Sequence, residues 1–236
     1  MKAEEYHIKQ YESVYRSTEK FVDWLEVSGY LGVDMPQRIC DIACGGGANL
    51  AYLSRRYKNS RFTGIDISHP LICYGAEKLK GEVNCELYQG DWFHLDTKWR
   101  DQFDGIISFQ TLSWLSEYHE PLRQLAELNP KWIAISSLFY KGDIEYSITL
   151  KNYYRVSNGK EYEKQYYNIY SLIRVRKHLE TLGYREFHFI PFEIDIDLPK
   201  PESMDVGTYT IKTEENKRLQ ISAALMMPWY FIVASK

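Results

Sequence analysis

A glycine-rich turn between an apolar segment and a helix-like segment constrains the fold most. Residues 39–43 are apolar apart from one aspartate, which is typical of a strand buried on both faces, and Gly45–Gly47 end this run. Residues 48–57 then carry Leu and Tyr side chains at helical spacing. Because glycine permits close backbone approach and a helix start offers free N–H groups, this strand, turn and helix predict a site for a nucleotide-like ligand.

Acidic residues recur at the ends of three successive strand-like segments. Asp66 lies 25 residues after Asp41, and Asp91 lies another 25 residues on. A fourth apolar segment, residues 103–110, follows them. In an open parallel sheet the carboxyl ends of the strands form one ligand crevice, so we expect the three carboxylates to converge on a single site.

Together these motifs resemble the class I S-adenosylmethionine-dependent methyltransferases, with specific matches over residues 36–138. The first family motif, acidic-x-Gly-x-Gly-x-Gly, reads Asp41-Ile-Ala43-Cys-Gly45-Gly-Gly47, and Ala43 replaces its first glycine. The resemblance implies an α/β, Rossmann-like fold with a seven-stranded, mostly parallel sheet and helices on both faces. It also implies S-adenosyl-L-methionine as the cofactor.

The resemblance implies roles for the first motif. Asp41 would act indirectly on the methionine amino group of the cofactor. The backbone at Ala43 and Gly45 would lie beside the methionine portion, with Gly47 at the start of the helix.

The same resemblance implies that residues at the later strand ends bind the ribose, the adenine and the sulfonium of the cofactor. Asp66 would accept hydrogen bonds from the ribose hydroxyls, and Ile67 would lie against the adenine. Asp91 would meet the adenine amino group, Trp92 would flank the ring, and Gln110 would lie near the sulfonium.

A nicotinamide dinucleotide fold is the main alternative within the same architecture. Its fingerprint needs Gly-x-Gly-x-x-Gly, and the frame that starts at Gly45 and Gly47 has Leu50 in the third position. Asp66 fits both families, whereas Asp91 directly after a glycine favours the methyltransferase.

Residues outside the core supply further candidates. Residues 4–28 form a helical region, and by resemblance such a leading segment covers the cofactor, which makes Tyr15 and Arg16 candidates for its methionine end. Packing against the sheet is the alternative. His119 follows the fourth strand, where its ordinary pKa would suit a general base, although a helix-start or surface role is the commoner one for a histidine two residues before a proline.

An unusual density of tyrosine marks residues 139–170, which hold eight of the chain's 20 tyrosines. Tyrosine combines a large apolar face with one hydroxyl, which suits a pocket for a polar organic substrate. We interpret this segment as a substrate lid, with Tyr154 and Tyr170 as candidate catalytic residues. Packing into the core or a homodimer interface are the alternatives.

We expect one methyltransferase domain over residues 1–236. It divides into an N-terminal helical cover (1–35), the cofactor-binding core (36–138), the lid insertion (139–170) and the C-terminal half of the sheet (171–236). The last part contains a β-hairpin, residues 208–222, inserted before the final strand.

Composition limits the partners. A net charge of −3 and a pI near 6.1 lack the basic footprint of nonspecific nucleic-acid binding. The amino terminus lacks a signal-like apolar region and no run of 18 uncharged apolar residues occurs, so we expect a cytoplasmic protein without a membrane partner. The four cysteines lack Cys-x-x-Cys spacing and read as reduced thiols, with no metal.

Three classes of function follow. The first is an enzyme that methylates a small polar metabolite, such as a sugar or nucleotide, by direct in-line transfer. The second is a protein or RNA methyltransferase; DNA amino-group modification is disfavoured because Gln110-Thr-Leu-Ser stands where an Asp/Asn-Pro-Pro-aromatic signature would occur. The third is a non-catalytic module that binds S-adenosyl-L-methionine.

Overall fold

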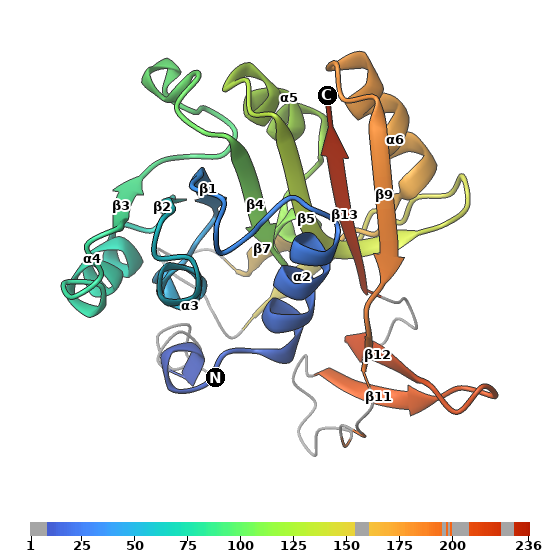
Figure 1. Ribbon diagram of the computed structural model, residues 1–236. Coiled ribbons are helices and arrows are strands. Elements are labelled where there is room, and N and C mark those ends of the chain that lie inside the picture. Colours follow the sequence, from blue (N-terminus) through green and yellow to red (C-terminus); the bar gives the residue numbers. More distant parts are fainter. Residues whose placement is uncertain (1–8, 154–160, 195–196, 198, 200–207, 223–228) are drawn as a thin grey trace.

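The computed structural model describes residues 9–153, 161–194, 197, 199, 208–222 and 229–236. In this part of the chain, eight strands form one twisted sheet with helices on both faces (Figure 1). Its main path runs β3 (Cys85–Gln89), β2 (Arg61–Asp66), β1 (Arg38–Ile42), β4 (Gly105–Phe109), β5 (Trp132–Tyr140), β13 (Trp229–Ser235) and β9 (Glu186–Pro191). The short β8 (Tyr170–Ser171) pairs with β5.

Strands β1 to β5 are parallel, and β13 runs antiparallel between β5 and β9. The reversal of strand order around β1 and β4 places a topological switch point at the carboxyl end of β1. This is the position at which open α/β sheets bind ligands. The Rossmann-like fold expected from the sequence is therefore confirmed.

Alternating side chains divide the core between the two faces of the sheet. Ile39 and Ile107 pack in the cluster that includes α2 (Arg16–Val27), α3 (Ala48–Arg56) and α4 (His69–Lys78). Their neighbours Cys40 and Ile106 pack in the opposite cluster, with α5 (His119–Glu127) and α6 (Leu172–Thr181). Central strands buried on both faces explain why their sequences are continuously apolar.

The N-terminal region is helical in two parts. Residues 9–12 are helical, residues 13–15 are not, and α2 then begins at Arg16 with Tyr15 as its N-cap. The sequence pattern predicted one helical region over 4–28 and did not locate this break. Residues 1–8 lie outside the described residues.

The tyrosine-rich segment contains an antiparallel pair, β6 (Thr149–Asn152) and β7 (Glu163–Tyr166), before the chain returns to β5 through β8. Tyr167 and Tyr170 are buried, whereas Tyr153 is exposed. The insert therefore contributes part of its aromatic surface to the core. Tyr154, a candidate from the sequence, lies outside the described residues.

The C-terminal hairpin is also confirmed. Strands β11 (Thr208–Lys212) and β12 (Arg218–Ser222) are antiparallel, and β10 (Glu193–Ile194) extends them. They form a separate small sheet between β9 and β13 in sequence (Figure 1). Two short 3-10 helices, η1 (Thr97–Trp99) and η2 (Leu112–Trp114), flank β4.

Candidate cofactor site

A cavity of about 330 Å³ opens at the carboxyl ends of the parallel strands. Its volume falls within the range of small-molecule sites. Its lining comes from the ends of β1, β2 and β3, from the start of α4 and from the loop after β4: Ile42, Ala43, Gly45, Ile65, Asp66, Ile67, Leu71, Gly90, Asp91, Trp92, Phe93, Thr111 and Leu115.

The glycine turn after β1 contains residues in the left-handed region of backbone conformation. Ala43 (φ 59°), Gly45 (φ 56°) and Gly47 (φ 78°) all have positive φ. Gly47 is the N-cap of α3, and a Cβ there would lie 3.0 Å from a methyl carbon of Leu79. Alanine tolerates the first of these positions at a modest cost, so the departure of Ala43 from the family motif leaves the turn intact.

Asp66 connects the turn to the end of β2. Its carboxylate accepts the backbone N–H of Gly45 at 2.8 Å through Oδ2 and that of Ser68 at 2.8 Å through Oδ1. Each oxygen keeps a lone pair for another donor. The carboxylate is therefore fixed in place and still able to accept hydrogen bonds from a pair of hydroxyl groups.

Asp41 is fully buried one strand away. Neither of its carboxylate oxygens has a hydrogen-bond partner within the described part of the chain. Burial raises the pKa of Asp41 well above its usual range, and the negative charge of Asp66 raises it further. A buried carboxyl without partners is costly, which makes Asp41 a group that a bound ligand could satisfy, directly or through water.

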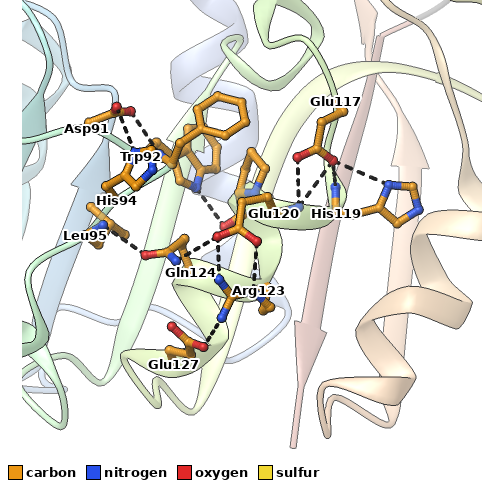
Figure 2. A network of polar contacts seen from close by, with 12 residues as sticks. Asp91, Trp92, His94, Leu95, Glu117, His119, Glu120, Arg123, Gln124 and Glu127 are labelled. Carbon is orange, nitrogen blue, oxygen red and sulfur yellow. Dashed lines mark hydrogen bonds and ion pairs between the residues drawn. The ribbon is translucent and has the colours of Figure 1, made fainter.

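Asp91 and Trp92 form the far wall of the cavity. The Asp91 carboxylate accepts the N–H of Phe93 at 2.9 Å and pairs with His94 at 3.3 Å. The Trp92 indole N–H donates to the carbonyl of Pro121 at 3.0 Å, which holds the ring against α5 (Figure 2). Ile67 also lines the cavity, and its side chain is 65% exposed. A ligand bound in the cavity would cover this apolar surface.

The N-terminal segment crosses the same edge of the sheet. The hydroxyl of Tyr11 donates to the carbonyl of Gly46 at 2.5 Å, and Thr18 donates to Asn49 at 3.0 Å. The side-chain amide of Gln110 donates to Ser17 at 3.1 Å. The contacts with Gly46 and Gln110 connect the segment to the turn after β1 and to the end of β4.

The predicted residues of the N-terminal segment fall beside these contacts. Tyr15 is half-buried and Arg16 is exposed, and neither lines the cavity. Gln110 has a positive φ of 57° and donates its backbone N–H to the carbonyl of Ser136. Its amide is therefore held next to the start of α2.

His119 is placed differently from the cofactor-site candidates. It begins α5, its side chain is 60% exposed, and its ring lies 3.4 Å from Glu117 and 4.1 Å, between centroids, from Tyr118. Figure 2 shows the ring pointing away from Asp91 and Trp92. His119 is not part of the cavity lining.

Tyr170 lies behind the cavity wall. Its hydroxyl donates to the carbonyl of Leu115 at 3.2 Å and accepts from the amide of Asn168 at 3.0 Å. Burial raises the pKa of Tyr170 to about 12, so the phenol stays protonated at neutral pH.

The cavity also includes residues that the sequence reasoning missed. Leu71, Phe93, Thr111 and Leu115 line it. Phe93 and Thr111 follow residues that the motifs had identified, so their place just after a strand was the available signal. Leu71 and Leu115 carry no such signal, because an isolated leucine near a helix is usually core.

The amino-acid sequence of this chain matches a family of known proteins over the part that forms the cavity. Residues 39–129 match the family described as a methyltransferase domain, and this range contains β1 without its first residue, all of β2 to β4 and the entire cavity lining. The match of residues 39–129 is thus to a methyltransferase domain. The domain carries each acidic residue that the sequence had assigned to the cofactor.

Curated relatives include two trans-aconitate 2-methyltransferases. The protein from Mycobacterium tuberculosis is 29% identical over 112 residues, which is 47% of this chain and 40% of the relative. The protein from Shigella flexneri is 27% identical over 120 residues, or 50% and 45% of the two chains. The match thus spans less than half the length of these relatives.

Solved structures share the fold of the methyltransferase domain over a longer range. The YcgJ protein from Bacillus subtilis superimposes with a TM-score of 0.58 at 12% identity, covering 92% of this chain and 98% of that chain. A sarcosine dimethylglycine methyltransferase from Galdieria sulphuraria gives a TM-score of 0.54 at 12% identity, covering 76% and 63%. These likenesses concern the architecture.

The cavity of this domain fits S-adenosyl-L-methionine. Asp66 offers two oxygens with free lone pairs at the position expected for the ribose, and Asp41 is an orphaned buried acid beneath the glycine turn. The lining between them is largely apolar, as an adenine ring requires. The described residues contain no group of three or more His, Cys, Asp or Glu side chains that could hold a metal ion. None of their helices has the length and apolar character needed to cross a membrane.

Replacing Asp41 with asparagine should stabilise the ligand-free protein at neutral pH. Because the folded-state pKa of Asp41 is raised, wild-type protein loses stability as the pH rises from the ordinary aspartate range towards that higher pKa. Asparagine does not ionise, so the difference in Tm between variant and wild type should be larger at pH 7.5 than at pH 5. Thermal unfolding at the two pH values measures it, and a difference that shrinks with rising pH would contradict the assignment.

Proposed function

We propose that this chain transfers a methyl group from S-adenosyl-L-methionine to a small polar metabolite. One observation carries the proposal: Asp66 and Asp91 line a single cavity of about 330 Å³ at the ends of neighbouring strands, and the fully buried Asp41 directly precedes the lining residues Ile42 and Ala43. The family match of the same residues supports it. When bound, the cofactor supplies a methyl group on a sulfonium sulfur.

The chain's own task is to hold and orient the reactants. Asp66 and the backbone of the glycine turn would bind the cofactor, while Ile42, Leu71 and Trp92 would keep water away from it. Fixing an acceptor in line with the methyl group can contribute roughly 7–11 kcal/mol through ordering that is completed on binding. No covalent intermediate with the protein is required.

The acceptor would lie between the loop after β4 and the tyrosine-rich insert. Trp114 of that loop is 40% exposed and packs against the ring of Tyr167 at 4.7 Å between centroids. The insert also presents Tyr153 at its surface. Aromatic faces suit a small organic molecule, and the net charge of −3 disfavours an extended polyanion.

A carboxylic acid is the first acceptor class to test. Two curated relatives are named for trans-aconitate, and a carboxylate is a nucleophile that needs no general base. Arg16 is exposed beside Ser17, which accepts the Gln110 amide at the end of β4, and would provide a cation at this edge. Sugars, nucleotides, proteins and RNA are the other classes.

Two measurements test the proposed function. Calorimetry should detect binding of S-adenosylhomocysteine but not of NAD⁺ to the purified chain. Incubation with isotopically labelled methyl donor and separate pools of carboxylic acids, sugars, nucleotides, protein and RNA should then label a small molecule, identified by mass spectrometry. Labelling confined to protein or RNA would overturn the proposal, and cofactor binding without any labelling would favour a non-catalytic module.

Replacing His119 with alanine tests its predicted role as a general base. Since the ring is exposed and lies outside the cavity lining, we expect turnover to change by less than about threefold, against the 10²–10⁴-fold contribution of a typical general base. The pH dependence of turnover should likewise be unchanged. A larger loss, recovered by raising the pH, would instead make His119 catalytic.

A further inference from the structure

A buried polar network lies directly behind the wall of the cofactor cavity. The wall residues Thr111 and Leu115 enclose η2, whose central residue, Ser113, is completely buried. The hydroxyl of Ser113 lies 2.6 Å from that of Ser137 on β5, and it accepts the N–H of Leu138 at 3.0 Å. The wall is thereby fixed to the sheet on one side.

Asn168, from the tyrosine-rich insert, holds the other side of this wall. It is 1% exposed. Its backbone N–H donates to the carbonyl of Ser113 at 2.7 Å, and its side-chain amide donates to the carbonyl of Leu115 at 2.9 Å. The same amide group reaches the hydroxyl of Tyr170 at 3.0 Å, and that hydroxyl in turn donates to Leu115.

The remaining atom of the Asn168 side chain faces the insert. Its carbonyl oxygen accepts the backbone N–H of Ile148 at 2.9 Å, immediately before β6. The carbonyl of Ile148 accepts the N–H of Tyr167 at 3.0 Å, whose ring packs on Trp114. The side chain of Asn168 therefore connects the cavity wall at Leu115 with the start of the β6–β7 pair.

We propose that Asn168 is a positioning residue that couples the cofactor cavity to the tyrosine-rich insert. Occupancy of the cavity orders the wall at Leu115, and the amide of Asn168 transmits that order to Ile148. The inference rests on the proposed function, because it takes the cavity as the cofactor site and the insert as the acceptor side.

The chemistry of the amide explains why asparagine suits this position. An amide donates through its nitrogen and accepts through its oxygen, so one short side chain satisfies Leu115, Tyr170 and Ile148 together. Aspartate has nearly the same shape and retains an acceptor for Ile148. It has no donor for the carbonyl of Leu115 when ionised, so it would break the link at the wall while keeping the link to the insert.

Hydrogen exchange measured by mass spectrometry, with and without saturating S-adenosylhomocysteine, tests the coupling on the full chain. In wild type, the ligand should slow exchange in residues 111–116 and also in residues 146–150. In Asn168→Asp, the first effect should persist and the second should fall at least fivefold. Ser171→Ala removes another hydrogen bond to the insert, to the carbonyl of Gly142 at 2.7 Å, together with the N-cap of α6, and should retain both effects.

Tyr170→Phe provides a second variant should Asn168→Asp fail to fold. It removes the hydroxyl between Asn168 and Leu115, and it should reduce ligand-induced protection of residues 146–150 without abolishing that of 111–116. Protection of 146–150 that is absent in wild type, or unchanged in both variants, would overturn the coupling alone. Failure of wild type to bind S-adenosylhomocysteine would overturn the proposed function as well.

Discussion

Replacing Asp66 with alanine should weaken binding of S-adenosylhomocysteine at least tenfold. The carboxylate fixes the backbone N–H groups of Gly45 and Ser68, each at 2.8 Å, and offers its remaining lone pairs to the ligand. Alanine removes the expected partner of the ribose hydroxyls and also frees the glycine turn. Hydrogen bonds to a charged acceptor are the stronger kind, so their loss outweighs that of a neutral contact. Isothermal titration calorimetry measures the affinity.

Asp96→Ala is the matched control for this variant. Asp96 also accepts a backbone N–H two residues ahead, from Lys98 at 2.9 Å, but it caps η1 and is not part of the cavity lining. Its removal should leave the affinity unchanged. An affinity for Asp66→Ala equal to that of wild type would mean that the ligand does not lie at the end of β2.

Replacing Gly75 with alanine should destabilise the protein by about 2 kcal/mol, although alanine is normally the better helix former. Gly75 lies inside α4, where a Cβ would stand 2.3 Å from the carbonyl oxygen of Gly46 in the glycine turn. That oxygen belongs to the backbone, so the clash is relieved only by moving the helix or the turn. For a chain of this size the expected fall in Tm is about 4–8 °C, and cofactor affinity should fall with it.

Gly81→Ala serves as the control, because a Cβ at Gly81 meets nothing within 4 Å. Its Tm should match that of wild type within about 2 °C. Thermal unfolding of the two variants in parallel gives the comparison. An unchanged Tm and affinity for Gly75→Ala would show that α4 does not hold the turn in place.

The proposed coupling through Asn168 and the proposed role of Asp66 can be separated by experiment. We expect Asp66 to act on cofactor affinity and Asn168 to act on the response of the insert once the ligand is bound. The two variants should therefore separate: one loses binding, and the other retains binding but loses the response at residues 146–150. Such a separation would link the cofactor site to the acceptor side through a single buried amide.

The sequence by itself determined the cofactor half of this protein. Strands buried on both faces leave continuous apolar runs, and a turn that approaches a ligand needs glycine or another small residue. The strands and the turn between Arg38 and Gln110 could therefore be predicted from the local sequence pattern. The sequence predicted that Asp41, Asp66 and Asp91 would converge because parallel strands end at one edge; in the structure Asp66 and Asp91 line one cavity, and Asp41 is buried next to the lining residue Ile42. The hairpin from Thr208 to Ser222 was also predictable from local pattern, because two strand-like segments flank a short polar turn.

Tertiary structure decided how the tyrosine-rich insert contacts the wall of the cavity. The cavity wall at Leu115 and the amide of Asn168 are 53 residues apart in sequence, and neither residue type stands out among leucines and asparagines elsewhere in the chain. His119 looked chemically suitable, yet the start of α5 turns its ring to the exposed side, beside Glu117. Periodicity and strand ends are local properties of a sequence. The partners of a buried amide depend on which distant segments the fold brings together, and that information appears only in three dimensions.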